Sequence, residues 1–318
     1  MQCKCCLFDG PGEVYQVREM QLGLRELFNY HQCSNCGALQ LIDIPENLAK
    51  YYPSDKYYSY NTSMKKQVKT DLLRKIKAGY ILYGKNKIAG SILSIGYKKP
   101  EYFDWLKKAK VEFDDAILDV GCGDGGLLVS LGTNGFTNLT GIDPFNQSDF
   151  DYGSVKIFKK DIFEIEGHFD FIMLNHVFEH LDNPKIILKR LYQLLKPRKY
   201  LLLRTPVMGT YAWKTYKENW MGLDAPRHLI VHTLKSIHLL AEEAGFKISA
   251  TSFDGIANNL IASEQYKRDI PLTDTNSYMV DKQSGQFTQN EIAAFKNTAE
   301  RTNREQQGDQ AAFFLYKP

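Results

Sequence analysis

Apolar and polar residues alternate in blocks along most of the chain, in an order typical of strands that are followed by helices. Short apolar runs bounded by glycine, proline or acidic residues predict strands at residues 116–120, 138–142, 155–158, 169–174, 200–204, 246–252 and 312–316. Apolar residues at helical spacing predict helices at residues 125–133, 183–195, 234–244 and 289–302. This alternation predicts an α/β, Rossmann-like fold: a seven-stranded, mostly parallel sheet with helices on both faces.

The first hundred residues follow a different pattern. A strand is expected at residues 39–44, and residues 45–60 form a loop rich in tyrosine. Residues 62–99 then have apolar residues at helical spacing and many lysines, with Asp71 as the single acid. Such a cationic amphipathic segment is typical of a surface that meets an acidic substrate or a membrane, so peripheral membrane contact through residues 65–99 is one expectation. A solvated helix face is the alternative.

Five of the six cysteines lie near the N-terminus, and four of them form two C-x-x-C pairs. Two residues between thiolates let both sulfurs of a turn reach one tetrahedral ion, and a second pair completes a set of four ligands. The pattern predicts a structural Zn²⁺ site, since a closed four-sulfur site does not activate water. Buried reduced thiols or a redox pair are the alternatives, and Cys5 can substitute for a ligand of the first pair. The predicted ligands are Cys3, Cys6, Cys33 and Cys36.

The charge and the composition exclude few kinds of partner or cellular compartment. The chain has 318 residues, with 40 Lys and Arg against 37 Asp and Glu, so its net charge of +3 neither requires nor excludes an anionic partner. No apolar run approaches the length of a membrane span, and the N-terminus lacks the order of a signal peptide. We therefore expect a cytoplasmic protein whose cysteines are not paired in disulfides.

The most informative motif is ILDVGCGDGG at residues 117–126. Glycines at the end of a strand let the backbone turn tightly and approach a ligand closely, which favours a nucleotide-like cofactor. The spacing of Gly121, Gly123 and Gly126 also fits the dinucleotide fingerprint G-x-G-x-x-G, and Asp143 follows at the distance of a ribose-binding acid. NAD is therefore an alternative cofactor at this point.

Polar residues also end the neighbouring strands. Asp119 lies two residues before the first glycine, where its carboxylate would face a cationic or amine-bearing ligand. Asp161 and Ile162 follow a later strand and combine an acid that can read an adenine amine with an apolar contact, and the strand after that ends in Asn175 and His176. Because ligands of a parallel sheet bind beyond the carboxyl ends of its strands, these residues are expected at one site.

This ordered set resembles the class I S-adenosylmethionine-dependent methyltransferases over residues 101–253, which also include VFEHL at 177–181 and LLKP at 194–197. The resemblance implies that the two glycines pass near the methionine part of S-adenosyl-L-methionine, with Asp119 near its ammonium or an ordered water. It implies that Asp143 accepts hydrogen bonds from the ribose hydroxyls. Helix capping or turn formation is the alternative role of both acids. The implied cofactor site consists of Asp119, Gly121, Gly123, Asp143, Asp161, Ile162, Asn175 and His176.

A hydroxyl or carbon acceptor must lose a proton when it is methylated, which requires a general base. Histidine is available near neutral pH, and the candidates are His176, His180, His228 and His232. We take His180 and His228 as the catalytic residues, with a structural hydrogen bond as the alternative for each. The neighbouring Arg227 can bind a phosphate or carboxylate of the acceptor with its guanidinium fork.

The chain ends extend the resemblance. The cysteine pairs, YYP at 51–53, APRHL at 225–229 and GDQA at 308–311 resemble a bacterial group of methyltransferases with an N-terminal zinc-binding domain. That group is related to sugar C-methyltransferases and common in surface-polysaccharide pathways, which implies a sugar acceptor and carbohydrate biosynthesis. The part after residue 255 is too short for the second large domain of the sugar C-methyltransferases, so O-methylation of a glycan is equally open.

The predicted organisation has four parts: a zinc-binding domain (1–45), the tyrosine-rich loop and basic helical segment (46–100), the cofactor-binding domain (101–254) and a C-terminal extension (255–318). We expect a methyltransferase for a small-molecule or glycan acceptor. An RNA methyltransferase that grips RNA with its zinc domain is disfavoured, because that domain has few basic residues and the charge is nearly balanced. A non-catalytic cofactor-binding protein is the other alternative, which the complete set of acids and glycines disfavours.

Overall fold

The structure is a computed structural model, and it describes residues 1–53 and 67–318. The chain divides into two compact units, each assembled from segments that are far apart in the sequence. Unit 1 comprises Met1–Pro53, His176–Leu188 and Leu203–Phe313, and unit 2 comprises Ser54–Asn175, Lys189–Leu202 and Phe314–Pro318. The part of the predicted tyrosine-rich loop and basic segment at residues 54–66 lies outside the described residues.

A parallel sheet forms the centre of unit 2. Its strands are β4 (Ala116–Val120), β5 (Asn138–Ile142), β6 (Phe150–Asp151), β7 (Val155–Phe158) and β8 (Phe169–Asn175). The neighbours β8, β4, β5 and β7 pair in parallel, and β6 pairs antiparallel with β7 at the edge. Strands inside a parallel sheet are covered on both faces, which explains why β4 and β8 are mostly apolar and buried.

Within the described residues the sheet has eight strands in the order β11-β12-β9-β8-β4-β5-β7-β6, where β9 is Leu195–Pro206, β11 is Lys247–Phe253 and β12 is Gln310–Tyr316. This confirms the predicted α/β, Rossmann-like class and corrects the strand number of seven. The additional strand is β6, whose two residues are too short to produce a hydrophobic period.

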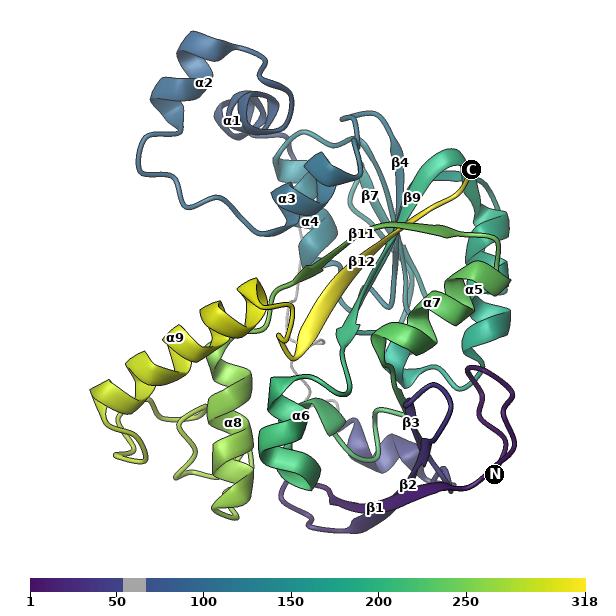
Figure 1. Cartoon of the computed structure of the whole chain (residues 1–318). Coiled ribbons are helices and arrows are strands. Elements are labelled where there is room, and N and C mark those ends of the chain that lie inside the picture. Colours follow the sequence, from purple (N-terminus) through teal and green to yellow (C-terminus); the bar gives the residue numbers. More distant parts are fainter. Residues whose placement is uncertain (54–66) are drawn as a thin grey trace. The chain divides into compact units, whose positions relative to one another are not determined.

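The helices of unit 2 are α1 (Leu72–Tyr83), α2 (Lys87–Leu93), α3 (Tyr102–Lys108), α4 (Gly126–Thr133) and the end of α5 (Pro184–Leu194). Figure 1 shows α3 and α4 on one side of the strands and α5 on the other. In the described part of the predicted helical segment, residues 67–99, the structure has the two helices α1 and α2, because Gly84 ends α1 in the left-handed region at φ 67°. At its start, the Asp71 carboxylate accepts hydrogen bonds from the backbone N–H groups of Leu73 and Arg74.

Helix α2 presents an exposed apolar face. Ile88, which is 81% exposed, and the exposed Ile92 lie four residues apart on α2, and Ile95, which is 82% exposed, lies in the turn after the helix. Exposed basic residues, among them Lys85 and Lys87, lie beside this face. Contact of this segment with a membrane surface stays a prediction.

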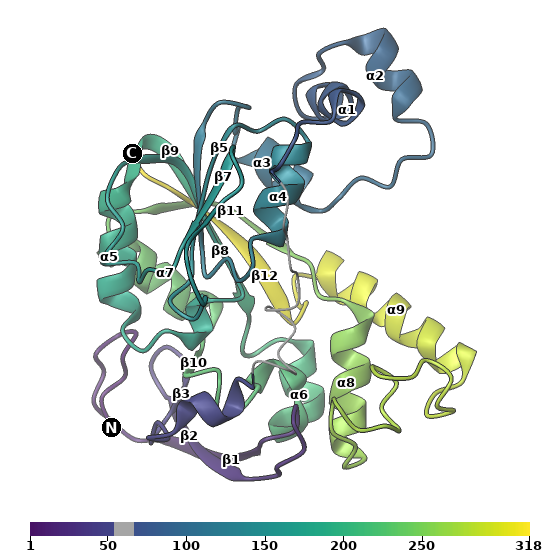
Figure 2. The ribbon, with the colours of Figure 1, turned by 180° about the vertical axis from the view of Figure 1, so that it is seen from behind.

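Unit 1 contains an antiparallel sheet in the order β1-β2-β3-β10. The N-terminal part supplies β1 (Gly12–Arg18), β2 (Leu27–Cys33) and β3 (Leu39–Leu41), and β10 (Ile230–Val231) pairs with β3 from a distant part of the chain. Figure 2 shows these strands beside one another. Sequence reasoning found only β3.

The remaining elements of unit 1 are mainly helical: α6 (Tyr211–Tyr216), α7 (Leu234–Glu243), α8 (Ala257–Lys267), α9 (Gln289–Arg304), and the short 3₁₀ turns η1 (Leu48–Tyr51), η3 (Phe178–His180), η4 (Lys217–Asn219) and η5 (Met221–Leu223). Capping boxes begin α7 at Thr233 and α9 at Thr288, as each side chain accepts from the backbone N–H three residues on. The predicted helices at α7 and α9 are confirmed, whereas α6 and α8 were missed. Within the described residues, every helix is too short or too polar to cross a membrane.

Candidate functional site

The glycine loop of the predicted cofactor site follows β4 directly. Gly121 and Gly123 have φ values of 71° and 53°, in the left-handed region that a side chain makes costly. The Gly121 N–H donates to the Ile142 carbonyl at the end of β5, 2.8 Å away, which ties the loop to the neighbouring strand. The loop thus has the backbone shape that the sequence motif predicts.

Asp143 follows β5 and holds this loop in place. Its Oδ2 accepts a hydrogen bond of 3.0 Å from the Gly123 N–H, and its Oδ1 accepts one of 2.9 Å from the Phe145 N–H. The side chain of Asn146 donates to the Gly123 carbonyl from 2.9 Å. A carboxylate has about four lone-pair positions. Two backbone bonds therefore leave acceptor capacity for further donors, such as a pair of hydroxyls.

The Asp119 side chain, on β4, is buried, and the negative charge of Asp143 acts on it. Burial, followed by the negative charge of Asp143, raises the Asp119 pKa from 3.8 to about 8. Burial also raises the pKa of Asp143, against the opposing effect of its hydrogen bonds from Phe145 and Gly123. Asp119 thus holds a proton at neutral pH until a positive charge is brought near it.

The other predicted cofactor residues of unit 2 lie after β7 and β8. Asp161 begins a turn in which its Oδ1 accepts from the Phe163 N–H at 2.9 Å, and the adjacent Ile162 is buried. Asn175 is the last residue of β8. The residues of unit 2 that the sequence predicts for the cofactor therefore all lie at or directly after the carboxyl ends of parallel strands, where ligands of such sheets bind.

His176 belongs to unit 1 and has a left-handed backbone at φ 55°. Its Nε2 lies 2.6 Å from Nη1 of Arg204, a group that only donates, so the ring proton is on Nδ1. Nδ1 in turn lies 3.4 Å from Oε1 of Glu179. Protein groups thus engage both ring nitrogens of His176, and its predicted place in the cofactor site stays a prediction.

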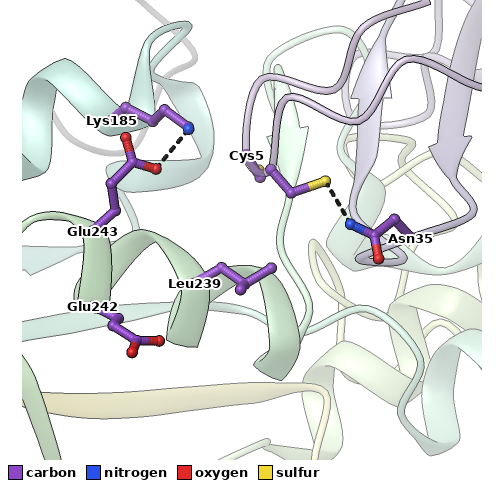
Figure 3. Close-up of a pocket in the computed structure, with 7 residues that line it drawn as sticks. Cys5, Asn35, Lys185, Leu239, Glu242 and Glu243 are labelled. Carbon is purple, nitrogen blue, oxygen red and sulfur yellow. Dashed lines mark hydrogen bonds and ion pairs between the residues drawn. The ribbon is translucent and has the colours of Figure 1, made fainter.

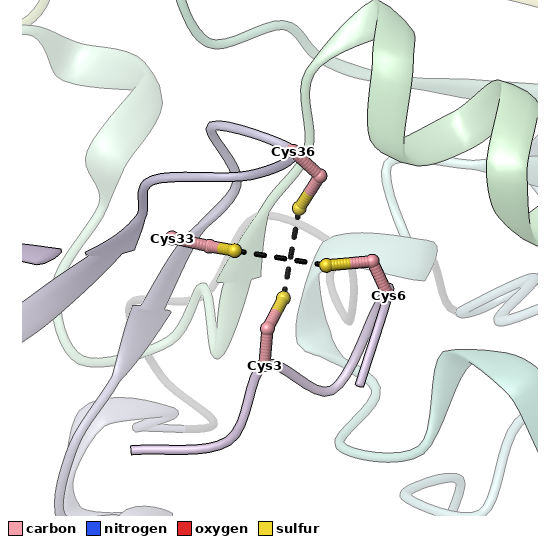
Figure 4. A group of neighbouring side chains, drawn as sticks. All are labelled: Cys3, Cys6, Cys33 and Cys36. Carbon is pink, nitrogen blue, oxygen red and sulfur yellow. Dashed lines mark hydrogen bonds between the residues drawn. The ribbon is translucent and has the colours of Figure 1, made fainter. Parts of the chain in front are cut away.

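The four predicted metal ligands come together in unit 1. Sγ of Cys3 lies 3.6 Å from Sγ of Cys36, the same distance separates Cys6 and Cys33, and the four sulfurs all lie within 4.8 Å of one another (Figure 4). A tetrahedral zinc ion with Zn–S bonds of about 2.3 Å requires sulfurs about 3.8 Å apart, whereas a disulfide requires about 2.0 Å. The spacing fits one metal ion and excludes the disulfide pairing of these thiols.

The two cysteine turns have the same local shape. The Leu7 N–H donates to the Cys3 carbonyl and the Gly37 N–H donates to the Cys33 carbonyl, each at 2.8 Å. Leu7 and Gly37 also share a left-handed backbone, with φ values of 59° and 77°. Such paired turns aim two sulfurs each at a common point, which is the arrangement of a zinc knuckle.

Cys5, the alternative ligand, lies outside the quartet. Its buried Sγ is 3.6 Å from Nδ1 of His232. A pocket of about 360 Å³ next to Cys5 is closed on one side by the ion pair of Lys185 with Glu243, at 2.6 Å (Figure 3). The residues that line this pocket include the predicted metal ligand Cys6 but no residue predicted for S-adenosylmethionine or for catalysis.

The two predicted catalytic histidines lie together in unit 1, around a buried carboxylate. The rings of His180 and His228 are 4.7 Å apart and nearly perpendicular. Glu179 is fully buried, and its Oε2 accepts a hydrogen bond of 2.9 Å from the Thr205 hydroxyl. Burial alone would raise the Glu179 pKa, but the His176 contact and the charge of the neighbouring histidines hold it below its usual value. Burial, and then the charge of His228, lowers the His180 pKa to about 4, so this ring is neutral near pH 7.

Arg227 has a different place from the one expected. The sequence suggested a guanidinium open to the acceptor, but the side chain is fully buried and its fork binds Asp224, with N–O distances of 2.9 and 2.6 Å. Nη2 also donates to Glu19 at 3.0 Å, and Nη1 donates to the Tyr51 carbonyl at 3.1 Å. Its donors are engaged inside unit 1, so the structure favours a role in holding this unit together over acceptor binding.

Sequence reasoning missed two residues of these sites. It gave Glu179 no role, because the burial of this side chain and its contacts with Thr205 and His228 depend on the fold. It also missed Asn146, which lies three residues after Asp143 and binds the glycine loop. Its position three residues after Asp143, the acid predicted to bind the ribose, was the sequence feature that could have indicated a role in this loop.

Comparison with known families agrees with this geometry. A family model described as a methyltransferase domain matches residues 76–251, more than half of the chain. The chain therefore belongs to the methyltransferase-domain family. Its mostly parallel sheet, with a glycine loop after β4, places it among the class I, S-adenosylmethionine-dependent members.

Individual relatives are distant. The EEF1A lysine methyltransferase 2 of Mus musculus is 49% identical over 39 residues, which are 12% of this chain and 16% of that protein. The ubiquinone biosynthesis O-methyltransferase of Rickettsia bellii (strain OSU 85-389) is 26% identical over 177 residues, 51% of this chain and 69% of that protein. A solved SAM dependent methyltransferase from Archaeoglobus fulgidus is 18% identical, and the match covers 69% of this chain and 100% of that chain with a TM-score of 0.40.

Proposed function

We propose that the protein is an S-adenosylmethionine-dependent methyltransferase for a small-molecule or glycan acceptor, with a sugar as the favoured class. The observation that carries the proposal is the Asp143 carboxylate, which holds the Gly123 N–H of the loop after β4 and retains acceptor capacity. Membership of the methyltransferase family supports it. The cofactor would supply a methyl group on a positively charged sulfur, and Asp119 and Asp143 are the acids proposed to lie near its positive groups and hydroxyls.

The acceptor class rests on weaker support. The resemblance of the cysteine pairs and the APRHL motif to polysaccharide-pathway methyltransferases favours a sugar. The Rickettsia relative is named as an O-methyltransferase, which favours an oxygen nucleophile. We further propose that Cys3, Cys6, Cys33 and Cys36 bind a structural Zn²⁺.

The test of the function is product detection. Purified protein is incubated with S-adenosylmethionine carrying a labelled methyl group and with nucleotide sugars or extracted cell-surface glycans, and the products are analysed by mass spectrometry. We expect one labelled methyl group on a sugar. A thermal transition that neither S-adenosylmethionine nor S-adenosylhomocysteine shifts, while another nucleotide does, would contradict the proposal.

Cofactor binding should release a proton from Asp119. Its pKa of about 8 means that the carboxyl is protonated at pH 7, and a cationic ligand favours the carboxylate and lowers that pKa. Affinity should therefore rise from pH 6 to pH 8, with release of up to about one proton per cofactor at pH 7. Calorimetry in buffers of different ionisation enthalpy measures the released protons. Asp119→Asn should abolish the release, and an equal release in this variant would contradict the assignment.

His180→Ala and His228→Ala should each slow methyl transfer while cofactor affinity stays the same. A loss of about 10²- to 10⁴-fold in kcat is typical of a group that assists proton removal. His238→Ala, at an exposed histidine of α7, is the matched control. Unchanged turnover in both variants would mean that the acceptor loses its proton to another group.

A further inference from the structure

We infer that Glu179, His180 and His228 form a second metal site, which binds a divalent transition-metal ion through one carboxylate oxygen and two imidazole nitrogens. One ligand atom from each of the three side chains lies within 4.8 Å of the others. The group lies within unit 1 and is separate from the four-cysteine site, since the two share no residue.

Hydrogen bonds fix which ring nitrogen of each histidine is free to coordinate. Nδ1 of His180 lies 2.9 Å from the Arg227 carbonyl, and Nδ1 of His228 lies 2.9 Å from the Gly222 carbonyl. A carbonyl only accepts, so both Nδ1 atoms carry the proton and both Nε2 atoms carry a lone pair. Histidines that bind metals usually donate their other N–H to a carbonyl or a carboxylate in this way.

The carboxylate completes the set. Oε2 of Glu179 is held by the Thr205 hydroxyl, whereas Oε1 receives no hydrogen bond of good geometry from the described residues. The nearest ring nitrogens to Oε1 are Nδ1 of His176, at 3.4 Å, and Nε2 of His228, at 3.9 Å. A fully buried carboxylate is costly without a partner of opposite charge. A divalent cation between Oε1 and the two Nε2 atoms would satisfy all three acceptors at once.

The donor set indicates the kind of ion. Two imidazoles and one carboxylate are the protein ligands of several open zinc sites and of non-haem iron sites, which keep positions for water or substrate. Nitrogen and oxygen ligands also suit Mn²⁺, whereas the four thiolates favour Zn²⁺. This inference deepens the proposed function in one respect: the open positions would bind an oxygen of the acceptor, and His180 and His228 would act as ligands instead of free bases.

A proton is the competing occupant. Nε2 of His228 also lies 3.8 Å from Oδ2 of Asp224, so a protonated His228 could pair with both acids. Asp224 is already bound by the guanidinium of Arg227, however, whereas the ion-pair partners of Glu179 among the described residues are only the imidazoles of His176 and His228. This asymmetry favours a metal ion at Glu179.

Binding of Mn²⁺ to the full chain, loaded beforehand with one equivalent of zinc for the four thiolates, tests the site. Electron paramagnetic resonance detects free aqueous Mn²⁺, and we expect one Mn²⁺ to be bound per chain. Glu179→Gln and His228→Gln should weaken binding at least tenfold, while the exposed control His238→Gln should bind as the wild type does. If no Mn²⁺ binds up to a concentration of about 1 mM, the inference is overturned, because a dissociation constant above that value corresponds to only weak binding.

Folding and cofactor binding are checked in the same samples. Because Glu179 is buried and its replacement can unfold unit 1, His180→Gln at a partly exposed position is the second variant. It should lose Mn²⁺ affinity at least tenfold with unchanged zinc content and thermal transition, and wild-type affinity in this variant would contradict the site. Calorimetry with S-adenosylmethionine separates the two proposals. Mn²⁺ binding without cofactor binding would refute only the proposed function, and cofactor binding without Mn²⁺ binding would refute only the second metal site.

Discussion

Replacement of Cys33 by serine is expected to release zinc and to unfold much of unit 1. The Cys33 side chain is buried, and its sulfur is one of four within 4.8 Å of one another. Mutation of a residue that only hydrogen-bonds to a metal ligand typically lowers the affinity for the metal by about 10- to 100-fold. Loss of a ligand itself should cost more. The apparent binding energy of structural zinc is about 10–16 kcal/mol in zinc-finger peptides and is also folding energy, so the thermal transition should fall with the metal content.

Elemental analysis after dialysis against a chelator measures the metal, and calorimetric melting measures the stability. Cys5→Ser is the stringent control, because Cys5 lies in the same turn but outside the quartet. It should retain zinc. Full zinc content in Cys33→Ser, or loss of zinc in Cys5→Ser alone, would replace the ligand set proposed here.

Asp143→Ala is expected to weaken S-adenosylmethionine binding by about tenfold to several hundredfold. Hydrogen bonds to a charged group contribute about 1.5–3 kcal/mol each, and about 1.4 kcal/mol is a factor of ten in affinity. The variant loses the acceptors proposed for the ribose hydroxyls and also the bonds that hold the N–H groups of Gly123 and Phe145. The glycine loop should therefore loosen as well.

Asp143→Asn separates these two effects, since its amide oxygen can still accept from Gly123 while the charge is gone. It should bind the cofactor more weakly than the wild type and more tightly than Asp143→Ala. Asp114→Ala, at an exposed acid before β4, is the matched control and should leave the affinity unchanged. Wild-type affinity of Asp143→Ala in titration calorimetry would remove Asp143 from the cofactor site.

Elements with strong local patterns were predicted from the sequence nearly residue by residue. The strands β4, β5 and β7 have the bounds that their apolar runs predict, because glycine or charged residues end each run. The strands β1 and β2 were missed, because β1 is largely exposed and so lacks the regular alternation of a half-buried strand. Pairing of β10 with β3 joins residues almost two hundred positions apart, which no local pattern contains.

The candidate sites show the same division. Cys3, Cys6, Cys33 and Cys36 could be selected from spacing alone, because metal coordination dictates it. The place of Arg227 could not be read in this way, since one of its partners, Glu19, lies far away in the sequence. A charged residue in an aromatic loop has the same local appearance whether it faces a substrate or a buried acid. The group around Glu179 depends on Thr205 and His228, which only the folded chain brings together.

The pairing of β10 with β3 affects how the cysteine-rich part can be handled as a separate piece. Its outer strand, Ile230–Val231, is encoded almost two hundred residues after Leu39–Leu41. A fragment truncated after Pro53 would expose the backbone edge of β3, and exposed strand edges promote self-association. Transfer of the two cysteine turns to another protein would require a substitute for that strand. We therefore expect stable zinc binding only in pieces of the protein that also contain β10.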